Sequence, residues 1–319
     1  MVNIAYIFPG QGSQYVGMGK DLYDNFASAR EIFDKASTIV KFDLKKLCFE
    51  GPQEELSKTE NCQPAILAAS IAALKVLEAE SRCLPDGGVV VGSDYVPKFS
   101  LGLSLGEYTA LVACGSIFFE DALVLVRKRG EIMEEASRKV PGRMACILGM
   151  ELKAVEDLCK GFGCEIANLN CPGQVVISGK TSNVELFASL AKEKGAKRVV
   201  MLDVSGPFHS SLMTGASDKL KTYIEKVTIR PPVMSFLSNV DASIQTDPQK
   251  IKENLITQVN SKTLWEQSVR NVAAQGITTF FEIGPGTVLK GLIKKINPLL
   301  EVRNIGMLQD IQAFTLPQS

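Results

Sequence analysis

One serine of the sequence lies in a pattern that is typical of catalytic nucleophiles. Ser104 is the centre of Gly102-Leu103-Ser104-Leu105-Gly106, a Gly-x-Ser-x-Gly pattern that places a serine on a tight turn between a strand and a helix. An apolar stretch precedes the turn and helix formers follow it, so free backbone N–H groups would stabilise negative charge beside the hydroxyl. A serine that only caps the helix is the structural alternative. The context favours a serine that forms a covalent intermediate.

A serine hydroxyl needs a base, and the sequence contains a single histidine, His209. Histidine is the side chain whose ordinary pKa suits proton transfer near neutral pH. A lone histidine is usually structural, but His209 follows a Gly206-Pro207 turn at the end of an inserted unit described below. Clefts commonly form where two such units meet. We therefore predict that Ser104 and His209 are the catalytic pair.

Arg129 is the third candidate because of where its charge would lie. In the helix predicted for 120–139, apolar residues recur at spacings of three and four, and Arg129 falls on the same stripe. Arg127 and Lys128 do not. A guanidinium on a buried face needs a carboxylate partner or an anionic ligand. A structural ion pair is the commoner outcome, but Arg129 is close in sequence to the serine turn, so we predict that it binds a carboxylate on the acyl group.

A glycine-containing turn after the first apolar stretch offers backbone donors. An N–H group of Gly10-Gln11-Gly12, together with that of Leu105, would bind an oxyanion. A dinucleotide-binding loop is the rival interpretation, but its Gly-x-Gly-x-x-Gly pattern needs glycine where the chain has Tyr15. We therefore expect Gln11 and Leu105 to supply an oxyanion hole.

These candidates lie at the ends of strands in a pattern of alternating strands and helices. The predicted strands are 4–8, one ending at 102, 233–237 and 278–283, and the helices include 20–36, 63–78 and 120–139. Such alternation is typical of α/β folds in which helices cover a parallel sheet. The stretch 84–97 is polar and irregular, and we assign it no function.

A second pattern interrupts this alternation. The predicted elements are strands at 144–148, 165–169, 174–178 and 198–204, with helices at 151–161 and 183–195. The order βαββαβ is that of a ferredoxin-like unit. We predict a parallel-sheet α/β domain made of residues 1–139 and 206–319, with a ferredoxin-like subdomain inserted at 140–205.

Composition argues against several classes of protein. Lys plus Arg and Asp plus Glu both total 35, so no basic field attracts nucleic acid, and the apolar runs are shorter than the roughly 18 to 20 residues of a membrane span. Eight cysteines without a Cys-x-x-Cys pair, together with one histidine, predict reduced thiols and no metal site. The first residues lack the features of a signal or transit peptide. We expect a cytoplasmic monomer without a cofactor, or a plastid or mitochondrial protein if a transit peptide has been removed.

Several motifs together resemble those of one enzyme family, in order along nearly the whole chain. They are Phe8-Pro9-Gly10-Gln11-Gly12-Ser13-Gln14, Gly102 to Glu107, Arg129-Gly130, Gly206-Pro207-Phe208-His209-Ser210 and Glu282 to Gly286. This succession is similar to that of the malonyl-CoA:acyl carrier protein transacylases. The resemblance implies a hydrolase-like α/β domain with a ferredoxin-like subdomain, and malonyl transfer from malonyl-CoA to the phosphopantetheine thiol of holo acyl carrier protein for fatty acid biosynthesis.

The resemblance also implies roles for individual residues. Ser104 would attack the malonyl thioester in a ping-pong reaction, and Arg129 would bind the free carboxylate. His209 would be oriented by the backbone carbonyl of Gln258 in place of an acidic partner. Three further positions match the family's pocket: Gln63, Asn168 and Phe208, whose ring would disfavour a methyl-branched acyl group.

One residue departs from the common family pattern, because Leu103 stands where many relatives have histidine before the nucleophile. The main rival function is a serine esterase or thioesterase, for which a buried Arg129 has no use and which would need an acidic residue between Ser104 and His209. A catalytically silent carrier-binding module is the second rival. The presence of Ser104 and His209 argues against it.

Overall fold

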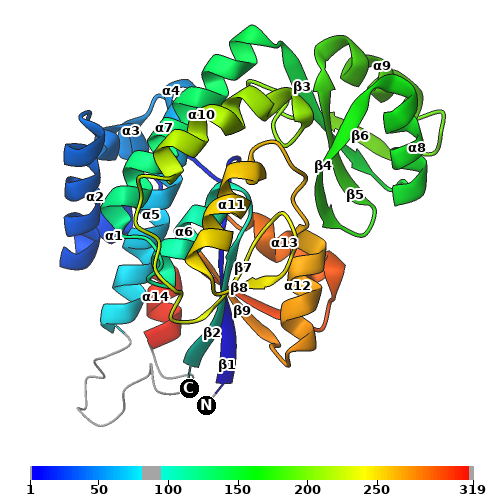
Figure 1. The fold of residues 1–319 in the computed structure, drawn as a ribbon. Coiled ribbons are helices and arrows are strands. Elements are labelled where there is room, and N and C mark those ends of the chain that lie inside the picture. Colours follow the sequence, from blue (N-terminus) through cyan, green and yellow to red (C-terminus); the bar gives the residue numbers. More distant parts are fainter. Residues whose placement is uncertain (1, 81–94, 316–319) are drawn as a thin grey trace.

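A six-stranded sheet lies at the centre of the larger part of the molecule (Figure 1). The structure, a computed structural model, describes residues 2–80 and 95–315, so most of the irregular stretch 84–97 lies outside the described residues. The strands are β1 (Val2–Phe8), β2 (Tyr95–Gly102), β7 (Ser235–Leu237), β8 (Ile244–Gln245), β9 (Thr279–Ile283) and β10 (Glu301–Ile305). Their order is β10-β9-β1-β2-β7-β8, and all neighbours are parallel except β7 and β8. The predicted parallel-sheet α/β class is confirmed.

Helices cover both faces of this sheet. Alternation along β1 explains why, since Ile4 and Phe8 join one apolar core and Ala5 and Ile7 join another. Around the first core lie α1 (Lys20–Asn25), α2 (Ala27–Val40), α3 (Leu44–Glu50), α4 (Gln53–Ser57), α5 (Thr59–Glu80), α6 (Leu105–Ala113), α7 (Phe119–Lys139), α10 (Thr214–Ile224), α11 (Pro248–Gln258) and α14 (Leu308–Thr315). The second core contains α12 (Trp265–Ala274) and α13 (Val288–Ile296).

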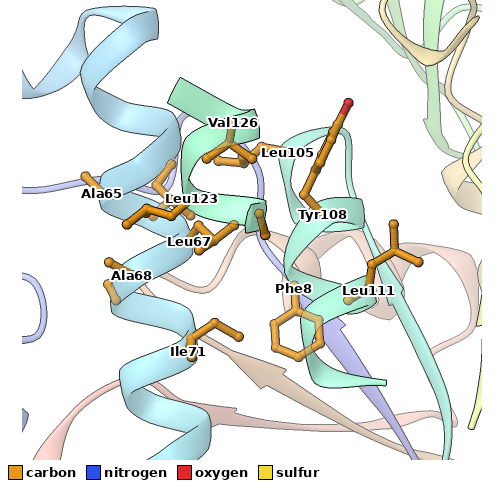
Figure 2. Close-up of a cluster of buried hydrophobic side chains, with 14 of the residues drawn as sticks. Phe8, Ala65, Leu67, Ala68, Ile71, Leu105, Tyr108, Leu111, Leu123 and Val126 are labelled. Atoms are coloured by element: carbon orange, nitrogen blue, oxygen red, sulfur yellow. The ribbon is translucent and has the colours of Figure 1, made fainter. Parts of the chain in front are cut away.

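Helix α5 is long and largely buried. It is the one helix in the described ranges that is long and apolar enough to cross a membrane, with a mean hydropathy of 1.4, but 83% of that window is buried inside the protein. A helix that is apolar on all sides is typical of a core. Figure 2 shows why: Leu67 and Ile71 of α5 face Phe8 of β1, Leu105 of α6 and Leu123 of α7.

A second sheet of four antiparallel strands forms the unit at the upper right of Figure 1. It comprises β3 (Gly142–Leu148), α8 (Leu152–Phe162), β4 (Cys164–Cys171), β5 (Gln174–Lys180), α9 (Thr181–Ala191) and β6 (Arg198–Met201). The strand order β4-β5-β3-β6 is that of a ferredoxin-like unit, which confirms the predicted fold. The exact limits 140–205 stay a prediction.

Several element boundaries differ from those predicted. The single helix expected at 20–36 is two helices, because Phe26 is extended at φ −124° and Arg30 caps the free carbonyls of Tyr23 and Asp24. The last strand of the small sheet ends at Met201, not 204. Strand β2 begins at Tyr95, within the stretch 84–97 that was predicted to be irregular. Its register against β1 shifts at Pro97, because a proline supplies no N–H.

Candidate active site

Ser104 lies on a strained turn between β2 and α6. Its φ is 52° and its ψ −103°, so the backbone is in a region that L-residues rarely adopt. The flanking glycines permit this turn: a Cβ at Gly102 would lie 2.0 Å from the Gly106 oxygen, and one at Gly106 would lie 2.0 Å from the Phe8 oxygen. The turn therefore projects the serine hydroxyl above the carboxyl end of the sheet.

His209 lies directly beside this hydroxyl. Its Nε2 is 2.8 Å from Ser104 Oγ, although 105 positions separate the two residues in the chain. The other ring nitrogen, Nδ1, is 2.9 Å from the Gln258 carbonyl oxygen and 3.2 Å from that of Ser261. Two carbonyl acceptors require a proton on Nδ1, so Nε2 is left free to accept the serine proton.

The surroundings of His209 keep its ring neutral. Burial, followed by the charge of Arg129, lowers the pKa of His209 to about 4, while the two carbonyl acceptors oppose this effect. The side chain is only 5% exposed. A neutral imidazole at physiological pH is the form that a general base must have.

Arg129 is fully buried on α7 and has no carboxylate partner within ion-pair distance in the described part of the chain. Nη1 donates to Gln63 Oε1 at 2.8 Å, whereas Nη2 donates to Gln258 Oε1 at 2.9 Å and to Ser104 Oγ at 3.1 Å. Nε has no acceptor. Burial lowers the pKa of Arg129, yet a guanidinium remains charged at neutral pH. Such a cation is a site for an anionic group of a ligand.

Backbone donors lie on the other side of Ser104. Among the described residues no acceptor is found for the N–H of Gln11 or of Leu105, the first residue of α6. Both residues line the cavity that contains Ser104 Oγ. The first N–H groups of a helix have no acceptor within that helix. These donors are therefore free to bind an oxygen that becomes negatively charged.

A cavity of about 230 Å³ surrounds the serine between the two sheets. The larger unit contributes Gln11, Ser104, Arg129 and His209, and α13 adds Val288 and Leu292. The small sheet supplies the opposite wall with Met144, Cys146, Asn168, Asn170, Gln174 and Val176. Among the described residues the lining is mainly apolar and holds the Arg129 cation, which suits a short acyl chain that ends in a carboxylate.

The structure brings together all nine residues predicted for the site. Phe208 and Asn168 line the cavity, and Asn168 Nδ2 donates to Thr263 Oγ1 at 2.5 Å. Gln63 and Gln258 lie behind Arg129 and hold its guanidinium. Leu103 also lines the cavity, so an apolar side chain occupies the position before the nucleophile.

Sequence reasoning assigned no role to two residues beneath the serine turn, Asn239 and Glu107. Asn239 Oδ1 accepts the Ser104 N–H at 2.7 Å, and Asn239 Nδ2 donates to the Gly102 carbonyl at 2.7 Å. Glu107 is fully buried and accepts hydrogen bonds from Gln258 and from the Asn239 N–H. Asn239 follows β7, which neighbours β2, so a polar residue at the carboxyl end of an adjacent strand was the available signal.

Within residues 2–80 and 95–315, no group of three or more His, Cys, Asp or Glu side chains is placed to hold a metal ion. The seven described cysteines are buried free thiols. Ser104, His209 and Arg129 supply this cavity with a nucleophile, a base and a cation, the groups that acyl transfer to and from a carboxylate-bearing chain requires.

Comparison with known proteins agrees with this chemistry. The sequence model of the acyl transferase domain family matches residues 5–309. The chain is 47% identical over 306 residues to the malonyl CoA-acyl carrier protein transacylase of Bacillus subtilis (strain 168), covering 94% of this chain and 92% of that relative. It is 40% identical over 319 residues to the protein of that name from Staphylococcus aureus (strain MRSA252), covering 98% and 99%.

Solved structures are similar over the same length. The acyl-carrier-protein-S-malonyltransferase of Bartonella henselae superposes with a TM-score of 0.91 at 38% identity, covering 98% of both chains. A malonyl-transacylase solved in complex with its type II PKS acyl-carrier protein gives a TM-score of 0.91 at 36% identity, with both chains fully covered. Both sheets are thus present in these relatives.

Proposed function

Because this chain belongs to the acyl transferase family and, within it, to the malonyl CoA-acyl carrier protein transacylases, we propose that Ser104 carries the malonyl group as a seryl ester. The enzyme is an [acyl-carrier-protein] S-malonyltransferase, which moves malonyl from CoA to acyl carrier protein for fatty acid biosynthesis. The observation that carries the proposal is the 2.8 Å contact of Ser104 Oγ with His209 Nε2, next to the buried Arg129.

The first half of the reaction acylates the enzyme. Ser104 Oγ attacks the thioester carbonyl of malonyl-CoA while His209 Nε2 accepts the hydroxyl proton. The backbone N–H groups of Gln11 and Leu105 bind the oxygen as it becomes negative. The tetrahedral intermediate collapses, the C–S bond breaks, and His209 gives its proton to the leaving sulfur, so that CoA departs as the thiol and the imidazole is neutral again.

The second half reverses these roles. The phosphopantetheine thiol of holo acyl carrier protein gives its proton to His209 and attacks the seryl ester carbonyl. The C–O bond to Ser104 breaks and the serine oxygen recovers the proton. During both halves the carbonyls of Gln258 and Ser261 stabilise the imidazolium form by accepting from Nδ1, as an acidic residue does in other serine enzymes.

Arg129 and the cavity wall select the acyl group. The guanidinium binds the distal malonyl carboxylate, because it is charged and buried and its Nε finds no acceptor within the described ranges. Phe208, 4% exposed, closes the cavity beside His209 and leaves little room for a branch on the acyl chain. We assign Gln63 to holding Arg129 and Asn168 to the cavity wall.

We further propose that the enzyme acts as a cytoplasmic monomer, without nucleic acid, membrane or cofactor. The equal numbers of basic and acidic residues support the absence of a nucleic acid partner. The burial of α5 in the core supports its role as a core helix instead of an anchor. Seven buried free thiols are typical of a reducing compartment.

Intact-protein mass spectrometry tests the covalent step. The purified chain is mixed with malonyl-CoA, acetyl-CoA or neither, and holo acyl carrier protein is then added. We expect a malonyl adduct on the wild type that moves to the carrier protein and persists in buffer alone. Ser104→Ala should form no adduct.

Ser116→Ala is the matched control, because Ser116 is also buried but its hydroxyl donates to the Arg230 carbonyl, away from the cavity. This variant should acylate like the wild type. An adduct that water removes as fast as the carrier protein does would indicate a hydrolase. No adduct on the wild type would refute the seryl ester.

A further inference from the structure

A buried polar cluster of Glu107, Asn239 and the Gln258 side chain lies beneath the active-site turn. None of these three groups contacts the reacting atoms in the steps described above. The centre of the cluster is Glu107, in the first turn of α6, with no exposed surface. Glu107 Oε2 accepts from Gln258 Nε2 at 2.5 Å and from the Asn239 N–H at 3.3 Å. The carboxyl oxygen therefore acts as an acceptor toward two elements that come from outside α6.

The Gln258 side chain connects this oxygen to the reacting groups. Gln258 Nε2 donates to the Ser104 carbonyl at 2.9 Å as well as to Glu107, and Gln258 Oε1 accepts from Arg129 Nη2 at 2.9 Å. The main chain of the same residue accepts from His209 Nδ1. One glutamine thus contacts the nucleophile, the base and the carboxylate-binding cation.

Glu107 is one of three groups that favour the observed direction of the Gln258 amide, together with the Ser104 carbonyl and the Arg129 guanidinium. A glutamine amide has an oxygen that accepts and a nitrogen that donates, and the two ends have nearly the same shape. A reversed amide would set its oxygen against Glu107 Oε2 and the Ser104 carbonyl, and its NH₂ against the Arg129 guanidinium. Each of these contacts sets an acceptor against an acceptor or a donor against a donor in a buried site, where an unmade hydrogen bond costs roughly 1 to 3 kcal/mol.

We propose that Glu107 is a positioning residue for acyl selection: through the Gln258 amide it fixes the orientation of the Arg129 guanidinium toward an acyl group that carries a free carboxylate. The proposal rests on the malonyl transfer described above and assigns Glu107 no contact with substrate. Its effect falls mainly on malonyl transfer, because acetyl-CoA offers Arg129 no carboxylate.

Two neutral variants of similar size separate this role from general support of the fold. Glu107→Gln keeps an oxygen that can accept from Gln258, whereas Glu107→Met fills the space without an acceptor. The readout is the ratio of kcat/KM for malonyl-CoA to that for acetyl-CoA, with thermal melting as a check of folding. We expect Glu107→Gln to keep this ratio within about threefold and Glu107→Met to lower it at least about tenfold, an effect typical of supporting residues.

The outcomes are distinct. A Glu107→Met protein that is folded and keeps the ratio overturns the proposal, as do parallel losses with both donors or an equal loss in Glu107→Gln. If Glu107→Met melts below the assay temperature, Glu107→Asp carries the test, because it withdraws the carboxylate from Gln258 by one methylene and should also lower the ratio. A wild type that forms no malonyl adduct would instead refute the underlying function.

Discussion

Replacement of Arg129 by methionine should change which acyl group the enzyme transfers. Methionine keeps much of the volume of the arginine side chain but none of its charge or donors. Two charge-assisted hydrogen bonds from the guanidinium to the malonyl carboxylate, at roughly 1.5 to 2 kcal/mol each, correspond to a loss of about 3 to 4 kcal/mol. At 1.36 kcal/mol per decade, kcat/KM for malonyl-CoA should fall about 10²- to 10³-fold.

Acetyl-CoA has no distal carboxylate, so its transfer should persist or rise. The protein should also remain folded, because the substitution removes a buried cation that has no carboxylate partner among the described residues. The assay is the initial rate of acyl carrier protein acylation with each donor, followed by mass spectrometry.

Lys128→Ala is the matched control on the same helix. Lys128 pairs with Glu131 at 2.7 Å and is 40% exposed, so both donors should react as with the wild type. A parallel loss of malonyl and acetyl transfer in a folded Arg129→Met protein would refute the carboxylate-binding role, since it would place the effect on the Ser104 hydroxyl alone.

Three further predictions concern proton binding and backbone packing. Because the pKa of His209 is lowered to about 4, kcat/KM for malonyl-CoA should be retained down to about pH 5 and fall only near pH 4; a pH–rate profile with a limb near 6.5 would contradict this. Burial raises the pKa of Glu107 to about 7, so wild-type stability should fall between pH 4.5 and 7, where the unfolded carboxyl has lost its proton and the folded one has not. Urea denaturation of Glu107→Gln should therefore show a stability advantage over the wild type that grows by about 3 kcal/mol across this range, and a pH-independent difference would argue against it. Gly102→Ala should prevent folding or lower the free energy of unfolding by more than about 3 kcal/mol, since its Cβ would meet the Gly106 backbone at 2.0 Å. Gly161→Ala is the control, because no described atom lies within 4 Å of its Cβ, and urea denaturation should show it to be neutral or stabilising.

The reacting residues were predictable from sequence because backbone geometry restricts them. Gly102 and Gly106 mark a turn that other residues cannot form, and the apolar stripe of α7 indicates the buried face on which Arg129 lies. The ferredoxin-like succession of strands and helices was equally predictable, since strand and helix periods alternate within about sixty residues. Local patterns of this kind depend on neighbours in the chain.

The contacts that support the serine turn were not predictable in the same way, although the resemblance named Gln258 as the residue that orients His209. Asn239 contacts Ser104 across 135 positions, and Gln258 contacts Glu107 across 151, so only the folded topology brings them together. The helix break at Phe26 was missed because the spacing of apolar residues continues across it. Strand β8 was missed because two residues are too few to show a period. Tertiary packing decides where this helix breaks and where this strand forms.

The two walls of the acyl cavity belong to different parts of the chain, and this separation has a consequence for how the protein can change. The nucleophile, base and cation belong to the unit around the large sheet, while Met144, Cys146 and Val176 come from the small sheet. Side chains on β3 and β5 alternate between the cavity and the apolar core under α8 and α9, where Ala145 and Ile177 lie. Substitutions on the cavity side of these strands can therefore reshape the acyl chamber while the chemical machinery stays intact, so that evolution or design can alter donor preference one position at a time.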